Sequence, residues 1–426
     1  LFKSLQLYTL LNPNKRRNKN VIKPPWILIL MGNVYYRNKD YSNAEEIYYE
    51  ALDNFRLFDS IYDDEKYLKS QEYKQNQYIF SKYSKIYSLI IILCFFYFDG
   101  FLILDNYCRS LFESPILISL SFFGIIFFGN ELLGLPFSIY YTFIIEEKFG
   151  FNKTTPKIYI SDKLKSWILT LLLGGGILSF IIFQFESIGK NFWIIAWIFI
   201  SLISILINGL YAQIIVPLFN KQSKLKEGDL RSEIEKYSNK VGFDLSNIFV
   251  IDGSKRSTKA NAYFSGFGKQ KRVTLYDTLI NKLNINQIVA VIAHEIGHYK
   301  KNHIIYNLFF SIIQTGFMLY ILSLFIYMPI FSESLGIETQ SFHIGLICFS
   351  ILFTPFSETI SLIFNLFSRK FEYEADQFAK KTHNGKYLIE ALKILSKDSL
   401  SNLTPHPKYV WWHYSHPTLF QRIVRL

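Results

Sequence analysis

Cysteine and charged residues are both scarce in this chain. Its 426 residues include 3 cysteines, and Asp, Glu, Lys and Arg together make up 19%. The cysteines lack the spacing of metal ligands and two of them lie in apolar stretches, which excludes a disulfide framework and a zinc finger. Because 50% of the residues are hydrophobic and 18% are aromatic, a single soluble enzyme fold is also excluded. The composition indicates a membrane protein.

An apolar core is missing from the first 20 residues, which are basic and polar and start with Leu1 rather than Met. This pattern excludes a standard secretory signal at this position. We interpret residues 1–65 as an N-terminal segment that is truncated or misjoined, and we assign it no fold.

Long uncharged stretches are prominent in the rest of the chain. Each of six such stretches is long enough to cross about 30 Å of hydrocarbon as a helix. They are residues 86–104, 115–143, 167–185, 192–219, 304–330 and 342–366. They divide the chain into a membrane domain at 66–219, a polar segment at 220–303, a membrane hairpin at 304–366 and a polar C-terminal segment at 367–426.

Basic residues are distributed unevenly about these spans. Alternation of the spans places both long polar segments on one side of the membrane and three short loops on the other. The short loops hold only Arg109 and Lys190, which leaves 44 of the 46 Lys and Arg residues on the first side. By the positive-inside rule that side should be the cytosol. The net charge of +12 is therefore read as an orientation signal, and no nucleic-acid partner is expected.

The clearest chemical signal is the string from His294 to His298, which reads His-Glu-Ile-Gly-His. An apolar run precedes it, so the string is expected on a helix. At about 100° per residue the two histidines lie about 40° apart on one face and can chelate one ion. Glu295 points about 100° away from His294, so it can reach a water on the metal without ligating the metal. This is the spacing of zinc peptidases, which predicts one Zn²⁺.

A third ligand must come from another part of the chain. His303 follows His294 by nine residues and would face about 180° away on the same helix, so we expect it at the surface or beyond the ligands. Two spans return residues 367–426 to the side of the histidines. There Glu372 and Asp376 share one helical face, so one can ligate while the other orients a ligand histidine. Spacing alone does not choose Glu372 over Glu374.

Two further polar groups are candidates for contact with a substrate. His416 could stabilise an oxyanion if the fold brings it near the metal, although a structural role for His416 or His413 is an equal alternative. Residues 248–251 and 260–264 are expected to form short strands. An edge strand beside the metal helix could pair with an extended peptide, with Asn261 adding side-chain hydrogen bonds, although an ordinary hairpin is the plainer interpretation.

In their order along the chain these motifs resemble the type I CAAX prenyl endopeptidases, which are integral-membrane zinc metalloproteases of the gluzincin type. The resemblance covers roughly residues 65–426. The matching strings are residues 135–153, 252–264, 294–298, 369–376 and 413–417. Their shared order makes the resemblance more specific than any one string.

The resemblance assigns a role to each residue of the predicted site. The implied zinc ligands are His294, His298 and Glu372, which also decides between the two acids. The implied catalytic residues are Glu295, as general base and acid, and His416, beside the oxyanion. Asn261 and Ala262 would bind the substrate, and Asp376 and Arg422 would orient the ligands.

The implied fold is an all-α polytopic membrane protein whose helices enclose a chamber, with a small α+β cytosolic insert that carries the zinc-metallopeptidase site. Residues 220–303 and 367–426 then form two cytosolic catalytic segments. Members of the family also carry a span before the region of Leu68, and residues 1–65 contain none.

The family removes the C-terminal tripeptide of prenylated CAAX proteins. The expected partners are therefore farnesylated or geranylgeranylated CAAX proteins and the lipid bilayer. The expected location is the membrane of the endoplasmic reticulum and the nuclear envelope, with the active site towards the cytosol. Two other functions stay open. One is a membrane quality-control zinc protease without a prenyl requirement. The other is a non-catalytic membrane scaffold or carrier, for which the polar residues Asn208 and Glu358 within spans are the reason.

Overall fold

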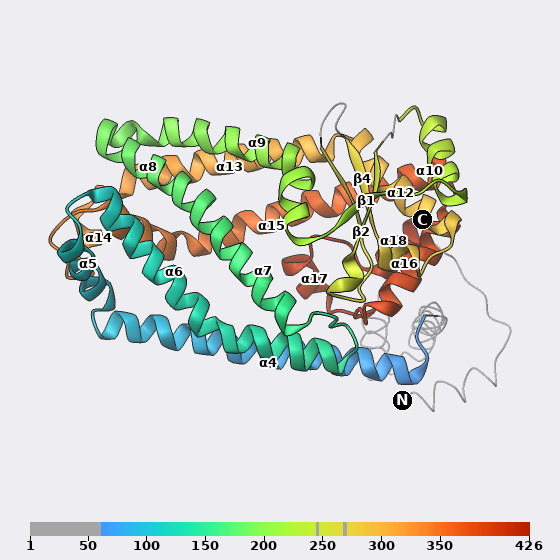
Figure 1. Cartoon of the computed structure of the whole chain (residues 1–426), viewed down its shortest axis with the longest axis horizontal. Coiled ribbons are helices and arrows are strands. Elements are labelled where there is room, and N and C mark those ends of the chain that lie inside the picture. The colour runs from blue at the N-terminus through green and yellow to red at the C-terminus, as the bar shows by residue number, and fades with distance from the viewer. Residues whose placement is uncertain (1–60, 244–246, 267–270) are drawn as a thin grey trace, which may run out of the picture.

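The structure is a computed structural model that describes residues 61–243, 247–266 and 271–426. The N-terminal segment predicted at 1–65 therefore lies outside the described residues as far as residue 60. The described chain is mostly helical and contains one small sheet of four strands. The long helices run along the length of the molecule, and the sheet lies at one end together with the C-terminal helices (Figure 1).

Five helical stretches of the described chain are long and apolar enough to cross a membrane. They are Glu65–Tyr97, Pro115–Glu146, Pro156–Phe219, His303–Phe325 and Phe342–Thr382. The third stretch folds back on itself as a hairpin (Figure 1). Its elements are α7 (Pro156–Leu169), a π-helical turn (Thr170–Gly174), α8 (Gly175–Ile188) and α9 (Phe192–Phe219).

Six further helices belong to the membrane part of the described chain. They are α4 (Asp64–Tyr97), α5 (Gly100–Leu111), α6 (Pro115–Tyr140), α13 (His303–Phe325), α14 (Pro329–Glu333) and α15 (Phe342–Thr382). The predicted span 86–104 does not correspond to one helix, because α4 ends at Tyr97 and α5 begins at Gly100. Asp99 has a left-handed backbone (φ 52°) and redirects the chain into α5.

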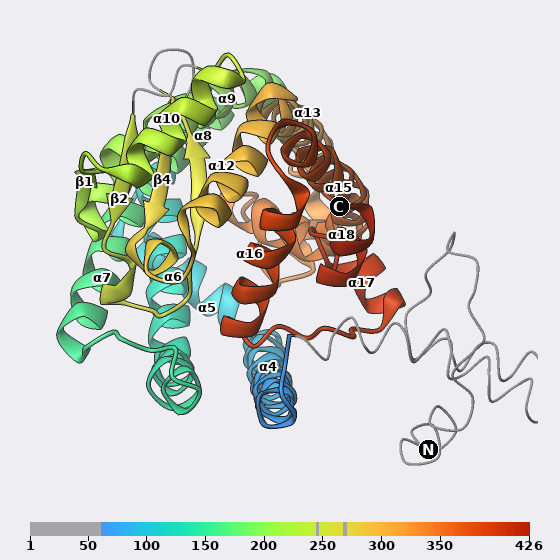
Figure 2. The ribbon, with the colours of Figure 1, turned by 90° about the vertical axis from the view of Figure 1, so that its right-hand side faces the viewer.

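Many apolar side chains of these helices are exposed. From Lys74 to Tyr97 no side chain of α4 is buried, and Leu93 is 56% exposed. Water would penalise such apolar exposure, whereas lipid would not. Viewed end on, α4 lies at the opposite side of the helical part from α9 and α13 (Figure 2).

A buried polar network joins the helices at the end opposite the sheet. His343, near the start of α15, lies between Asp105 of α5 and Ser119 of α6. Its Nε2 is 2.7 Å from Asp105 Oδ1 and its Nδ1 is 2.9 Å from Ser119 Oγ. Arg109 pairs with the same aspartate at 2.8 Å. Since these three central side chains are 1–2% exposed, the network fixes the start of α15 against α5 and α6.

The insert between α9 and α13 contains a mixed sheet with strand order β1-β2-β4-β3. The strands are β1 (Gln222–Lys224), β2 (Ile248–Ile251), β3 (Ala262–Ser265) and β4 (Arg272–Tyr276). β2 is parallel to β4, and the two outer strands are antiparallel to their neighbours. β2 has the predicted bounds, whereas β3 begins two residues later than expected. β3 is an edge strand and packs beside α12 (Ile285–Lys300).

The core of the insert lies around α12. The helices that surround it are α10 (Asp229–Lys240), α11 (Asp277–Ile280) and α16 (Gly385–Asp398), and the chain ends with α17 (Pro407–His413) and α18 (Leu419–Arg425). α12 begins at a capping box formed by Asn284 and Gln287. Its residues Ile288, Ala293 and Ile296 are at most 1% exposed. Burial of each such aliphatic side chain contributes about 1.5–3 kcal/mol, so α12 is a firm platform for the site.

Candidate metal centre

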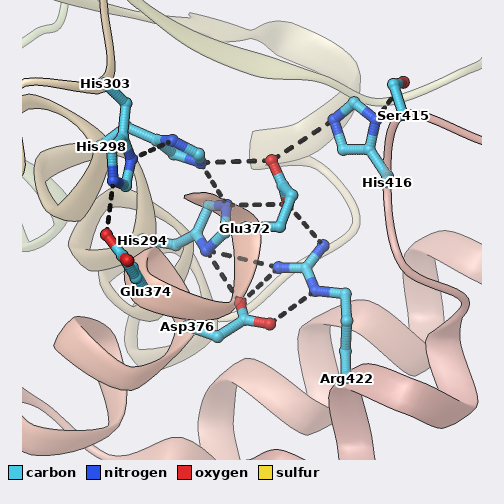
Figure 3. Close-up of polar contacts among 9 residues, drawn as sticks. All are labelled: His294, His298, His303, Glu372, Glu374, Asp376, Ser415, His416 and Arg422. Atoms are coloured by element: carbon cyan, nitrogen blue, oxygen red, sulfur yellow. Dashed lines mark hydrogen bonds and ion pairs between the residues drawn. The ribbon is translucent and has the colours of Figure 1, made fainter. Parts of the chain in front are cut away.

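The two motif histidines project from one face of α12. Their Nε2 atoms lie 3.1 Å apart, as expected for side chains one helical turn apart (Figure 3). The side chain of His294 is 8% exposed and that of His298 is 19% exposed, so the pair lies at the boundary of the core. Glu295 is half-buried and follows His294 on the neighbouring face.

α15 brings two acids against these histidines, and Gly297 makes the approach possible. A Cβ at position 297 would lie 3.1 Å from both the Cα and the carbonyl oxygen of Ala375. Such a distance is shorter than ordinary van der Waals contact, so only glycine fits without a shift of the helices. Ala375 lies between Glu372 and Asp376, so this helix contact sets both carboxylates opposite His294.

Glu372 completes a group of three possible metal ligands. One of its oxygens lies 3.5 Å from His294 Nε2 and the other 3.3 Å from His298 Nε2. One ligand atom from each residue lies within 4.8 Å of the others. Tetrahedral zinc with bonds of about 2.0–2.1 Å separates its ligand atoms by about 3.3 Å. Two imidazoles and one carboxylate at these separations are a donor set that zinc takes as the three protein ligands of a catalytic site.

Asp376 and Arg422 fix the ring of His294 from behind. Asp376 Oδ1 lies 2.9 Å from His294 Nδ1, so Nδ1 carries the proton of this ring and donates a hydrogen bond to the carboxylate. The lone pair of Nε2 then points towards Glu372. Arg422 of α18 donates to both oxygens of Asp376, at 2.9 Å and 2.6 Å. It also lies 3.5 Å from Glu372. The guanidinium thus compensates two carboxylates that are at most 5% exposed.

The electrostatics of this cluster favour a positive charge between the acids and the imidazoles. Burial acts to raise the pKa of Glu372, but hydrogen bonds from His294 and His298 outweigh it and hold this pKa well below its usual range. Burial and Arg422 act to lower the pKa of His294, yet the Asp376 and Glu372 carboxylates raise it to about 9. Burial also raises the pKa of Glu295, which makes this carboxylate a better proton acceptor.

His416 reaches the same site from the C-terminal segment. Its Nε2 lies 3.4 Å from Glu372 Oε1, and its Nδ1 lies 2.9 Å from Ser415 Oγ. Its side chain is 65% exposed, which places it at the open side of the cluster. If the Ser415 hydroxyl donates to Nδ1, then Nε2 carries the proton and can donate a hydrogen bond into the site.

Arg369 of α15 holds the loop that carries His416, and sequence reasoning missed this role. Its guanidinium donates to the carbonyl of Trp411 at 3.4 Å and also to the carbonyl of Tyr414. These carbonyls belong to the C-terminal turn of α17 and the residue after it, where a cation is favourable. The only signal in the sequence was that Arg369 opens one of the strings behind the family resemblance.

Asn261 and Ala262 are placed on the edge strand rather than in the cluster of Figure 3. Asn261 immediately precedes β3, and its Oδ1 accepts from the backbone N–H of Ala262 at 2.9 Å. Ala262 is opposite Leu275 of β4 in the sheet. The outer edge of β3 is therefore free of strand partners in the described chain, beside α12. Their role in binding substrate stays a prediction.

For His303 the expectation of a surface position was wrong, and the other alternative, a position beyond the ligands, is the one the structure shows. α12 ends at Lys300, and Asn302 adopts a left-handed backbone (φ 59°) that starts α13 in a new direction. His303 consequently does not face away from the site. It is 2% exposed, and its Nδ1 lies 3.0 Å from Nδ1 of His298. Asparagine tolerates this backbone conformation better than most residues, which was the available sign of a break.

The fold and the site together define a membrane metallopeptidase whose motif helix is completed by an acid from a later helix. Two family models cover the chain in sequence order. Residues 54–221 match the CAAX prenyl protease N-terminal model of five membrane helices, and residues 224–426 match the model of peptidase family M48. The chain belongs to the CAAX prenyl protease 1 family of M48 metallopeptidases and is a multi-pass membrane protein.

Individual relatives agree with this assignment. The chain is 35% identical to CAAX prenyl protease 1 of Saccharomyces cerevisiae, over 94% of this chain and 95% of the relative. It is 41% identical to the CAAX prenyl protease 1 homolog of Arabidopsis thaliana, over 73% and 74% of the two chains. The crystal structure of S. mikatae Ste24p superposes with a TM-score of 0.83 at 33% identity, over 95% of this chain and 99% of that one. The family and the fold class expected from the sequence are thereby confirmed.

Proposed function

We propose that this protein removes the C-terminal tripeptide of prenylated CAAX proteins by zinc-dependent hydrolysis. The observation that carries the proposal is the set of His294, His298 and Glu372, whose ligand atoms lie within 4.8 Å of one another and are of the types that zinc binds. The substrate class is supported by the similarity to CAAX prenyl protease 1 of Saccharomyces cerevisiae, which extends over 94% of this chain.

The residues of the cluster divide into those that hold one zinc ion and those that move protons. His294, His298 and Glu372 hold the ion, and Asp376 fixes His294 through the hydrogen bond described above. When bound, zinc supplies Lewis acidity that lets a water molecule lose its proton near neutral pH. Glu295 accepts that proton and later gives it to the leaving amine as the peptide C–N bond breaks.

His416 is suited to stabilise the oxyanion of the tetrahedral intermediate. Its Nε2 faces the same cluster as Glu372 and carries a proton when Ser415 donates to Nδ1. A hydrogen bond that is made to developing negative charge strengthens in the transition state, so it raises the rate of the chemical step. The side chain of His416 is 65% exposed, so a substrate carbonyl can reach its Nε2 from the open side of the cluster.

The edge strand β3 is suited to hold the substrate backbone. An extended peptide can add to a free strand edge through main-chain hydrogen bonds. Asn261 and Ala262 at the start of this strand would pair with the residues around the scissile bond. Because main-chain pairing does not read side chains, this mode suits an enzyme that accepts many different CAAX sequences.

The membrane accounts for the prenyl requirement. Each buried CH₂ of a lipid chain contributes about 0.8 kcal/mol to partitioning, so a prenylated C-terminus is concentrated at the bilayer. α5, which carries Arg109, and the turn between α8 and α9, which carries Lys190, lie at the end opposite the sheet (Figure 1). This placement supports an active site on the cytosolic side. We infer the endoplasmic reticulum and nuclear envelope as its location.

Purified protein in detergent tests this function with a farnesylated CAAX peptide and its non-prenylated counterpart. We expect tripeptide release from the farnesylated peptide, loss of release on chelation, and recovery with added zinc. Glu295→Gln should retain zinc and lose activity. Cleavage by Glu295→Gln at the wild-type rate contradicts the mechanism. Equal cleavage of both peptides would instead identify a quality-control protease, and absence of any hydrolysis would leave a scaffold or carrier.

A further inference from the structure

The two ligand histidines are held from behind in a parallel way. His294 presents Nε2 to the site and Nδ1 to Asp376. His298 presents Nε2 to the site as well, but its Nδ1 meets the imidazole of His303 at 3.0 Å. The other nitrogen of His303 lies 3.0 Å from Glu374 Oε2 (Figure 3). One ligand therefore reaches a carboxylate directly, and the other reaches a carboxylate through a second imidazole.

The geometry assigns the proton on each ring. A metal-binding Nε2 must present its lone pair, so the proton of neutral His298 is on Nδ1. Nδ1 of His303 must then accept this proton's hydrogen bond, which places the proton of His303 on Nε2. That N–H donates to the carboxylate of Glu374. The direction of donation is consistent from the ligand to the acid, with no donor facing another donor.

His303 is not a fourth ligand. Its Nδ1 faces the back of the His298 ring, on the opposite side from the Nε2 atoms that converge with Glu372. Its ring is held in place by stacking on Phe371, with centroids 4.2 Å apart and planes inclined by 15°. Phe371 immediately precedes Glu372 in α15, so the His303 ring packs against the helix that carries this ligand. Its outer partner Glu374 is 38% exposed and keeps contact with solvent.

We propose that His303 is a positioning residue for the metal centre, acting with Glu374 to fix the tautomer and orientation of His298. This inference rests on the zinc site proposed above. The left-handed Asn302 serves this arrangement, because it turns the chain and returns His303 to the ligand it follows by five residues. Removal of the hydrogen bond should loosen His298 while leaving all three ligand side chains in the protein.

The test compares three variants of the full chain, purified in detergent. His303→Leu keeps an apolar side chain against Phe371 and removes the acceptor. His303→Asn keeps an amide oxygen near the position of the accepting Nδ1. His383→Leu is the matched control, because His383 lies 3.2 Å from the backbone of Asn286 in the first turn of α12 but does not contact a ligand. Zinc affinity is measured by competition with a chromophoric chelator, without any substrate.

We expect His303→Leu to weaken zinc affinity by about 10- to 100-fold, the range seen when partners of ligand histidines are removed. His303→Asn should retain most of the affinity and His383→Leu nearly all of it. With Co²⁺ in place of zinc, the visible spectrum should change in His303→Leu and stay close to wild type in the other two. Thermal unfolding of the metal-free protein is measured alongside. A merely structural role would change this unfolding as well as the zinc affinity.

Four results would overturn the proposal. His303→Leu could bind zinc as tightly as wild type. His303→Asn could be as weak as His303→Leu, or His383→Leu could be equally weak, and either result reduces His303 to a packing role. Failure of the wild-type chain to bind zinc overturns the proposed function as well. If the wild-type chain binds zinc but does not cleave prenylated peptides, only the proposed substrate fails and the affinities still decide the role of His303.

Discussion

Gly297 of α12 lies against Ala375 of α15 so closely that a Cβ on the glycine would come within 3.1 Å of the alanine backbone. This contact joins the helix that carries the two histidines to the helix that carries the two acids. The glycine within the metal motif therefore has a packing reason that is separate from the spacing of the ligands. It sets the distance across which a metal ion must be held.

Gly297→Ala should weaken both the fold and the site. An added methyl in a tightly packed contact costs about 1–3 kcal/mol. A displacement of catalytic groups by about 1 Å can reduce the rate about 100-fold. Unfolding in detergent and zinc affinity are the measurements. Gly124→Ala in α6 is the control, because a Cβ there meets nothing within 4 Å. If both variants behave alike, helix separation does not matter at position 297.

Arg422→Met should strongly destabilise the protein. The arginine side chain is 12% exposed and pairs with Asp376, so its loss leaves an uncompensated buried charge at a cost of about 3–5 kcal/mol. Denaturant unfolding measures the loss. Arg231→Met is a suitable control, since Arg231 bridges two exposed acids on the surface. The double variant with Asp376→Asn should recover part of the stability, and no recovery would show that the pair is not the cause.

Zinc itself should raise the stability of the folded protein. Binding to the native state at 100 times its dissociation constant stabilises by about 2.7 kcal/mol. Metal-free protein should therefore unfold at a lower temperature, and added zinc should restore the transition. Glu372→Gln keeps the shape of the ligand but removes its charge, so this variant should show a much smaller zinc-dependent shift. A full shift in Glu372→Gln would exclude this acid as a ligand.

His416→Ala should reduce turnover and leave metal content unchanged. Loss of a single hydrogen-bond donor to an oxyanion costs about 100- to 1000-fold in kcat. The side chain is 65% exposed, so little effect on unfolding is expected. Steady-state kinetics on a farnesylated peptide, with zinc determined in the same samples, distinguish this role from a ligand role. A loss of zinc that matches the loss of activity would contradict it.

Arg369→Gln should resemble His416→Ala in direction. Its guanidinium is bonded to the carbonyls of Trp411 and Tyr414, so the loop before His416 should loosen when the charge is removed. The decisive measurement is a double-mutant cycle, in which coupled residues show a non-additive energy. Arg369→Gln should therefore change kcat very little once His416 is alanine. Independent, additive losses would mean that Arg369 acts elsewhere.

Local patterns predicted some of these features well. The period of the apolar residues placed His294 and His298 on one helix face, because both lie within a single uninterrupted helix. The strand β2 was also found, since Ile248–Ile251 is an unbroken apolar run. The start of β3 was shifted by two residues, because its pairing with β4 fixes where the strand begins. Contacts between neighbouring strands are not contained in the local pattern.

The remaining features depended on contacts between distant segments or on one backbone angle. Spacing could not choose Glu372 over Glu374, because the choice depends on how α15 rotates against Gly297; the family resemblance supplied it. In the structure the two acids have different contacts: Glu372 lies against the ligand histidines, and Glu374 lies against His303. The contact between His303 and His298 was missed because one left-handed residue, Asn302, ended the helix earlier than periodicity predicted.

α15 is one continuous helix, so it sets a fixed distance between its two ends. One end is anchored by His343 in the buried network with Asp105, and Glu372 lies about 44 Å further along at about 1.5 Å per residue. The acid that completes the metal centre therefore sits at a set height relative to the apolar part of the same helix. If the protein acts on prenylated chains as proposed, the length of chain between a substrate's lipid and its scissile bond has to match this height.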